Sequence, residues 1–173
     1  VGQCIHANAD IAKIALNQAS DFSFHWRQYP VKDKATLMDK TGDLFEEHRA
    51  EFIALLMREA GKTLSDAIDE VREAVDFCHY YAQQAREQLA NPLPLPGPVG
   101  EQNQLLLEGR GIFVCISPWN FPLAIFTGQI IAALVAGNTV LAKPARQTCL
   151  IAFRAIELIL AAGIPPAGLY LLP

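Results

Sequence analysis

The sequence of 173 residues predicts an α/β protein, in which an N-terminal helical segment precedes part of a Rossmann-like parallel sheet. Three observations support this prediction. Apolar residues recur at three- and four-residue steps through residues 11–89, as in amphipathic helices. A stretch rich in proline and glycine follows at residues 91–100. After it, apolar runs alternate in the order β-α-β-α-β, which is the building unit of a parallel sheet.

Three helices are expected in the first 90 residues. The first covers residues 11–26. Asp33 can cap the second helix, which continues to about Ala60 before Gly61 ends it. Thr63 can cap the third helix, whose apolar residues alternate steps of four and three and should form one buried face. These apolar residues are Leu64, Ile68, Val71, Val75, Cys78, Ala82, Ala85 and Leu89.

The remaining residues predict a connector and then the sheet. Residues 91–100 hold four prolines and two glycines, so we expect no regular element there. Residues 105–107 are strand-like, and residues 112–117 are typical of a buried strand. A helix over 121–136, a strand over 139–144, a helix over 148–161 and a strand over 169–172 complete the order. We therefore divide the chain into a helical segment (1–90), a linker with an edge strand (91–111) and a partial dinucleotide-binding unit (112–173).

Composition argues against several kinds of partner. The net charge of −4 and the pI of about 5.5 disfavour nucleic acid and anionic membranes, which bind basic surfaces. The uncharged segment 111–142 is interrupted by Pro118 and Pro122, and its longest uninterrupted part is shorter than the roughly 20 residues of a membrane span. The four cysteines lack metal-site spacing, so we expect no metal and free thiols in a reducing, cytoplasmic setting.

Two segments should lie where ligands bind in such sheets, beyond the carboxyl ends of the strands. They are residues 117–120, after the first strand of the sheet, and residues 143–146, after the second. Lys143 suits the hydroxyls or phosphates of a nucleotide, although a lysine at a strand end can also simply extend into water. Asn120 could aim its amide at a developing oxyanion or could cap the following helix. The usual glycine-rich phosphate loop is missing.

The segment FVCISPWNFPLAIFTGQIIAALVAGNTVLAKPARQT resembles the aldehyde dehydrogenase superfamily. The pairing of P-W-N-F-P with a later G-N-x-V-x-x-K-P-A is specific, and EAGKTLSDAIDEVREAVDFCHYYA resembles the helical segment before that family's cofactor domain. Within this superfamily, the segment most resembles the glutamate-semialdehyde (1-pyrroline-5-carboxylate) dehydrogenase modules of bifunctional proline utilisation A proteins. The resemblance implies oxidation of L-glutamate γ-semialdehyde to glutamate in proline catabolism, by an NAD-dependent aldehyde dehydrogenase of which this chain is an incomplete part.

The resemblance also implies roles for individual residues. Asn120 matches the asparagine whose amide stabilises the oxyanion during catalysis. Lys143 matches the lysine that contacts the adenosine ribose, and Ala145 matches the small residue beside it. The positions that match the lining of the NAD site are Ile116, Ser117, Pro118 and Trp119.

Two departures from the family's pattern matter. Position 146 is usually a glutamate that binds ribose hydroxyls, whereas Arg146 could favour a phosphate, so NADP is an alternative to NAD. The family's nucleophilic cysteine, general-base glutamate and glycine-containing cofactor loop match no residue here. We therefore expect the chain to be a piece of a longer protein and to be inactive alone. FAD is expected only if a proline dehydrogenase module precedes the segment.

Other interpretations remain open at this stage. A CoA-acylating or glutamyl-phosphate-type reductase would share the fold, and a non-catalytic assembly module would use the helices and an edge strand. The expected ligands are a small aldehyde and a dinucleotide, and the parent protein is expected to be a homo-oligomer.

Overall fold

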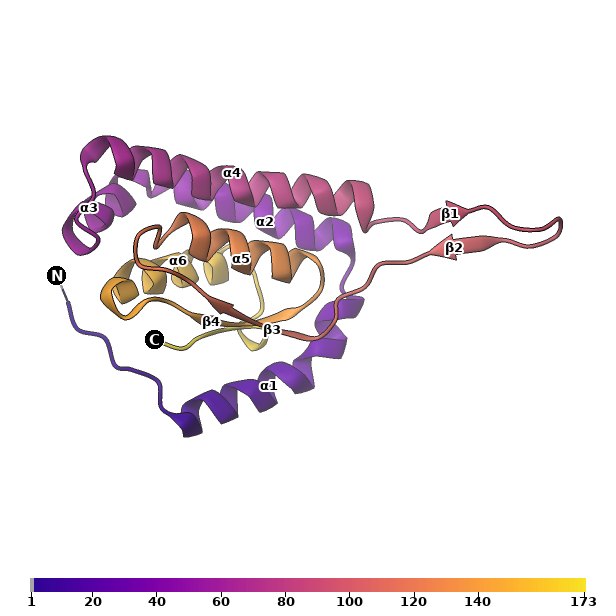
Figure 1. Ribbon diagram of the computed structural model, residues 1–173, viewed down its shortest axis with the longest axis horizontal. Coiled ribbons are helices and arrows are strands. Elements are labelled where there is room, and N and C mark those ends of the chain that lie inside the picture. Colours follow the sequence, from indigo (N-terminus) through magenta and orange to yellow (C-terminus); the bar gives the residue numbers. More distant parts are fainter. Residues whose placement is uncertain (1) are drawn as a thin grey trace.

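The computed structural model describes residues 2–173 and confirms the α/β architecture (Figure 1). The helices are α1 (Ala9–Gln28), α2 (Val31–Glu47), α3 (Arg49–Glu59), α4 (Leu64–Gln88), α5 (Ala124–Val135) and α6 (Cys149–Ala161). The strands are β1 (Leu93–Leu95), β2 (Asn103–Leu105), β3 (Ile112–Ile116), β4 (Thr139–Lys143) and β5 (Leu169–Leu171). Two short 3₁₀ turns, η1 (Arg146–Thr148) and η2 (Pro166–Gly168), precede α6 and β5.

The elements form layers around a three-stranded parallel sheet. Its strand order is β3-β4-β5, and Ile116 pairs with Lys143 at the carboxyl end of the first two strands. Helix α1 lies on one side of the sheet, α5 and α6 lie on the other, and α2 and α4 form an outer layer over them (Figure 1). This is the β-α-β-α-β unit that the alternation of apolar runs predicts.

The predicted single helix over residues 33–60 is wrong, because the chain breaks at His48 into α2 and α3. Residues 46–51 offer only Ala50 as an apolar side chain, so no buried surface holds a straight helix together there. Asp33 lies inside the first turn of α2, and Pro30 occupies the capping position. The break allows α3 to pack against α6.

Helix α4 confirms its predicted cap, but its buried face is shifted from the predicted one, with Ile68, Val75 and Leu89 only half-buried. The Thr63 side chain accepts a hydrogen bond from the Asp66 amide, as expected of an N-cap. The buried stripe includes Val71 but leaves Leu64 exposed. Small residues and one glutamate complete this face, which packs between α2 and α5. The buried residues of α4 are Ala67, Glu70, Val71, Ala74, Cys78, Ala82 and Ala85.

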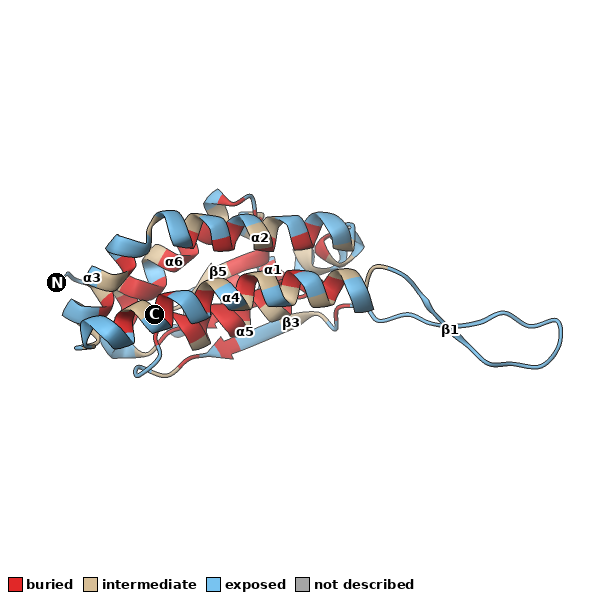
Figure 2. Cartoon of the chain, turned by 90° about the horizontal axis from the view of Figure 1, so that it is seen from above, coloured by how far each residue is buried: buried red, intermediate tan, exposed pale blue. Residues whose placement is uncertain are grey.

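The prediction that the connector has no regular element is wrong. It contains strand β1, which pairs antiparallel with β2 (Figures 1 and 2). Leu93 pairs with Leu105 and Leu95 with Asn103, so β2 begins two residues before the predicted strand. Alternating prolines permit this pairing, because the leucines between them supply the amides that face β2. All six strand residues are exposed, and the hairpin extends away from the body.

The prediction that strand β3 is buried is wrong, because most of its residues are exposed, as Figure 2 shows. Only Cys115 is buried in it, whereas four of the five residues of the central strand β4 are buried. The reason is position: β3 has a single neighbour in the sheet formed by residues 2–173. Helix α5 also begins at Ala124, three residues later than predicted, because the turn before it uses Phe121–Leu123.

One hydrophobic core joins the helical segment to the sheet. It contains Trp26 of α1, Phe45 of α2, Phe52 of α3, Phe126 of α5 and Val140 of β4. The division at residues 90 and 111 stays a prediction, since the core runs across it. Within residues 2–173, no helix has both the length and the hydrophobicity that crossing a bilayer requires.

A buried amide, Asn138, ties the end of α5 to the start of β3. Its Oδ1 accepts hydrogen bonds from the amides of Arg110 (2.6 Å) and Gly111 (3.0 Å), and its Nδ2 donates to Ala133 O (3.1 Å). Both ends of the amide are therefore satisfied, as a buried polar group requires.

Replacing this amide should destabilise the fold. We expect Asn138→Leu to lower the free energy of unfolding by about 2–4 kcal/mol, because it leaves buried donors and an acceptor without partners. Asn103→Leu, on the exposed strand β2, should change it by less than about 0.5 kcal/mol and serves as the control. Urea unfolding followed by circular dichroism measures both, and equal losses would contradict the role given to Asn138.

Candidate functional site

The two predicted site segments are neighbours at the carboxyl edge of the sheet. Ile116 and Lys143 are paired residues of β3 and β4, and the Ser117 amide donates to Lys143 O at 3.1 Å. The parallel register therefore brings the turn after β3 beside the turn after β4. This is the edge at which ligands bind in open α/β sheets.

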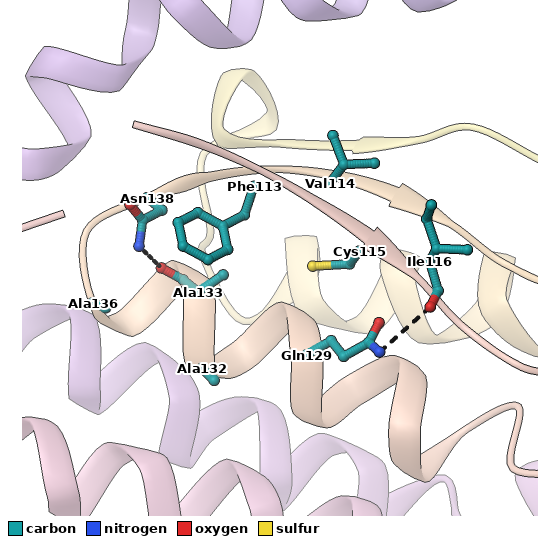
Figure 3. A pocket seen from close by; sticks show the side chains of 9 residues that line it. All are labelled: Phe113, Val114, Cys115, Ile116, Gln129, Ala132, Ala133, Ala136 and Asn138. Carbon is teal, nitrogen blue, oxygen red and sulfur yellow. Dashed lines mark hydrogen bonds between the residues drawn. The ribbon is translucent and has the colours of Figure 1, made fainter. Parts of the chain in front are cut away.

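The start of the turn after β3 is held by Gln129 of α5. The buried Ser117 hydroxyl donates to Gln129 Oε1 at 3.2 Å. Gln129 Nε2 donates to Ile116 O at 3.4 Å (Figure 3). Gln129 could not be predicted from the sequence, because nothing in the sequence distinguishes a glutamine that binds a neighbouring turn from one that simply faces solvent.

The end of the same turn is held by Glu70 of α4. Its Oε1 accepts from the amides of Leu123 (2.8 Å), the capping residue of α5, and of Ala124 (3.2 Å), the first residue of that helix. Its Oε2 pairs with Lys62, whose ammonium lies 4.1 Å from the centre of the Phe121 ring. The possibility that Asn120 caps α5 is therefore wrong, because Glu70 takes that role.

Glu70 was missed although the sequence carries a signal for it. Its position lies on the same helix face as Ala67, Val71 and Ala74, so a charge falls inside an apolar stripe. A carboxylate in such a position must be paired with a cation or with hydrogen-bond donors. The amides that Glu70 binds could not be identified from spacing along the helix, since they belong to Leu123 and Ala124, more than fifty positions away.

Asn120 and Trp119 lie exposed at the tip of the turn and line one hollow of about 490 Å³. The opposite side of this hollow comes from the loop before α4 and from α4 itself. Its charged lining residues are Lys62, Asp66, Asp69, Glu70 and Glu73. The hollow therefore combines the Asn120 amide with a mainly acidic lining, since Lys62 is paired with Glu70, and such a polar lining suits a small polar substrate.

Ile116 and Lys143 line a second hollow of about 540 Å³ on the α1 side of the sheet. Its floor is apolar and includes Val114, Leu141 and Leu172. The exposed Lys143 places its ammonium 3.0 Å from Pro144 O. An apolar floor with one cation at the rim fits a nucleoside, whose base packs on apolar surface and whose ribose or phosphate accepts from the ammonium.

The remaining predicted residues surround these hollows. Pro118 and Ala145 are half-buried, and Arg146 is exposed with its Nε 3.2 Å from His6 Nε2. Glu59 of α3, which the sequence analysis also missed, accepts from the first amides of α6. These are the amides of Leu150 and Ile151, both at 2.9 Å. Glu59 thus holds the turn after β4 much as Glu70 holds the turn after β3.

A third hollow, drawn in Figure 3, follows the exposed face of β3 and does not reach Asn120. Cys115 is its single titratable lining residue, and burial raises the pKa of this thiol to about 11. Burial raises the pKa of Cys149 to about 11 and that of Cys78 to about 12. These thiols are protonated at neutral pH. In residues 2–173, no group of three His, Cys, Asp or Glu side chains could hold a metal ion.

Comparison with known proteins shows what the chain resembles. The model of the aldehyde dehydrogenase family matches residues 1–173. The bifunctional protein PutA of Escherichia coli K12 is 49% identical over 174 residues, covering the whole chain but 12% of that protein. A mutant of proline utilization A from Bradyrhizobium japonicum superposes with a TM-score of 0.96 at 50% identity, over 98% of this chain and 17% of that one.

A solved structure of 1-pyrroline-5-carboxylate dehydrogenase from Thermus, with NAD bound, superposes with a TM-score of 0.89 at 35% identity. This match covers 96% of the chain and 33% of the Thermus chain. The chain thus spans a third or less of the length of these relatives.

Proposed function

Because the chain belongs to the aldehyde dehydrogenase family, we propose that the protein containing it oxidises L-glutamate γ-semialdehyde to glutamate in proline catabolism. The semialdehyde forms from 1-pyrroline-5-carboxylate, the compound that appears in the name of the Thermus relative. The observation that carries this proposal is Asn120, whose exposed amide stands at the tip of a turn held at both ends, beside a polar hollow.

Asn120 is the proposed catalytic residue of this chain. A carbonyl oxygen gains negative charge when a nucleophile attacks, and a fixed amide N–H donor stabilises that charge. Donors fixed beforehand need no reorganisation during the reaction, so the bonds that restrain the turn support this role. The nucleophile itself is assigned to no cysteine of this chain.

NAD is the proposed cofactor, with Ile116, Ser117, Pro118, Trp119, Lys143 and Ala145 as the residues that would hold it. When bound, NAD accepts the hydride removed from the substrate. Lys143 would donate to the ribose while Ile116 packs against the nucleoside. Ser117 would act through its bond to Lys143 O, which fixes the separation of the two turns. Arg146 leaves NADP as the alternative.

Three further properties belong to the same proposal. The four free cysteines support a cytoplasmic location, since thiols persist in reducing compartments. The exposed hairpin and β3 offer surfaces for a homo-oligomer. FAD would be a cofactor only of a proline dehydrogenase module elsewhere in the same protein.

Removing the Asn120 amide should slow the chemical step. In the full-length protein, we expect Asn120→Ala to lower kcat about 100- to 1000-fold, because one donor to the oxyanion is lost. NADH formation from L-glutamate γ-semialdehyde measures this, with Asn103→Ala as the control. A kcat within threefold of wild type would overturn the assignment. Activity that requires CoA would favour an acylating reductase instead.

The cofactor preference can be measured by titration calorimetry of the full-length protein with NAD and NADP. We expect tighter binding of NAD, and we expect Arg146→Glu to weaken NADP further, because a carboxylate repels a 2′-phosphate and accepts from ribose hydroxyls. Tighter binding of NADP to the wild type would replace NAD as the proposed cofactor.

The 173-residue chain alone should have no dehydrogenase activity. Three of its four thiols are buried, and their raised pKa values keep them protonated at neutral pH, so they are poor nucleophiles. Aldehyde-dependent NADH formation by the purified chain is the measurement. A rate above that of a heat-killed control would refute the prediction.

A further inference from the structure

We propose that Glu70 is a positioning residue for Asn120, and that its buried carboxylate fixes the turn over residues 117–123 in the shape that presents the amide. This inference rests on the proposed function, in which Asn120 donates to the oxyanion. Glu70 lies on α4, outside both predicted site segments.

The Glu70 carboxylate and the amides that it binds are buried. Glu70 is 1% exposed, and Leu123 and Ala124, whose amides it accepts, are 0% exposed. A buried carboxylate is costly unless both oxygens are satisfied. Here Oε1 accepts from the amides of Leu123 and Ala124, Oε2 forms an ion pair with Lys62, and the positive end of the α5 dipole adds to the attraction. The arrangement is therefore closed, and each member requires the others.

Glu70 contacts the same turn that carries Asn120. Glu70 bonds to Leu123, three residues beyond Asn120, and through Lys62 it reaches the face of the Phe121 ring, one residue beyond. The other end of the turn is fixed at Ser117 by Gln129. Asn120 thus lies on a short stretch of backbone with both ends anchored, while its own side chain stays exposed for a ligand.

A second carboxylate, Glu59, anchors the neighbouring turn. Glu59 makes the same kind of contact with the first amides of α6, after the turn that carries Lys143. The two carboxylates therefore anchor different turns. If each acts through its own turn, loss of Glu70 should affect the oxyanion donor, and loss of Glu59 should affect the cofactor side.

The experiment uses the full-length protein with the variants Glu70→Ala, Glu70→Gln and Glu59→Ala. Asp76→Asn, an exposed carboxylate of α4, controls for loss of charge. We expect Glu70→Ala to lower kcat about 10- to 100-fold, as a displaced catalytic group does, while KM for NAD stays within twofold. Glu70→Gln retains one acceptor oxygen, so it should recover part of kcat. Glu59→Ala should mainly raise KM for NAD.

Hydrogen exchange provides a measure that does not depend on activity. In Glu70→Ala, the peptide containing Leu123 and Ala124 should exchange faster than in wild type, and Glu70→Gln should restore part of the protection. If Glu70→Ala does not fold, the Glu70→Gln variant alone tests the proposal through the same two measurements.

The outcomes separate the inference from the proposed function. If the wild-type protein does not oxidise the semialdehyde, the proposed function is overturned. An active wild type whose kcat is unchanged by both Glu70 variants would overturn the positioning role. Equal changes of kcat and KM for NAD in the Glu59 and Glu70 variants would also overturn it, because they would indicate a general structural effect.

Discussion

The arrangement depends on one electrostatic constraint: the first amides of α5 and α6 need acceptors, and the helical segment supplies them as carboxylates. Helix N-termini leave backbone amides without partners inside the helix, and burial makes those amides costly. No acidic residue occurs from residue 111 to residue 156, and neither capping residue, Leu123 of α5 or Thr148 of α6, makes a side-chain capping bond, so these acceptors come from elsewhere in the chain. Glu59 and Glu70 meet this need, and in doing so they fix the two turns at the carboxyl edge of the sheet.

This division of work explains the uneven distribution of charge along the sequence. The second half folds as an apolar unit whose strands and helices pack closely, and charge within it would be buried without a partner. The first half carries most acidic and basic residues on exposed helix faces, and a few of their side chains contact buried groups of the second half. Lys62 and Glu70 are such a pair, and they lie beside the hollow that also contains Asn120.

Much of the fold could be predicted because the local signals agree with the tertiary structure. Thr63 caps α4, and the strand and helix order of residues 112–173 follows from the apolar runs and from the glycines and prolines that end them. The break at His48 was missed because the apolar spacing on its two sides is compatible with one helix, and the polar stretch 46–51 alone does not show that α3 turns to pack against α6. Strand β3 was expected to be buried because its residues are apolar, and its edge position is a property of the sheet. The site followed a similar pattern: Asn120 and Lys143 stand out in the sequence, whereas Glu59, Glu70 and Gln129 act through contacts across the fold.

The β1–β2 hairpin has a consequence for unwanted association. Leu93 and Leu95 direct their amides to β2, so the opposite edge of β1 is formed by Pro92, Pro94 and Pro96, which have no amide hydrogen. At these three residues that edge offers carbonyl acceptors but no amide donors, so growth into a larger β-structure is favoured at the β2 side. The prolines thus restrict strand addition to this exposed hairpin mainly to the β2 edge and disfavour edge-to-edge aggregation at the β1 edge.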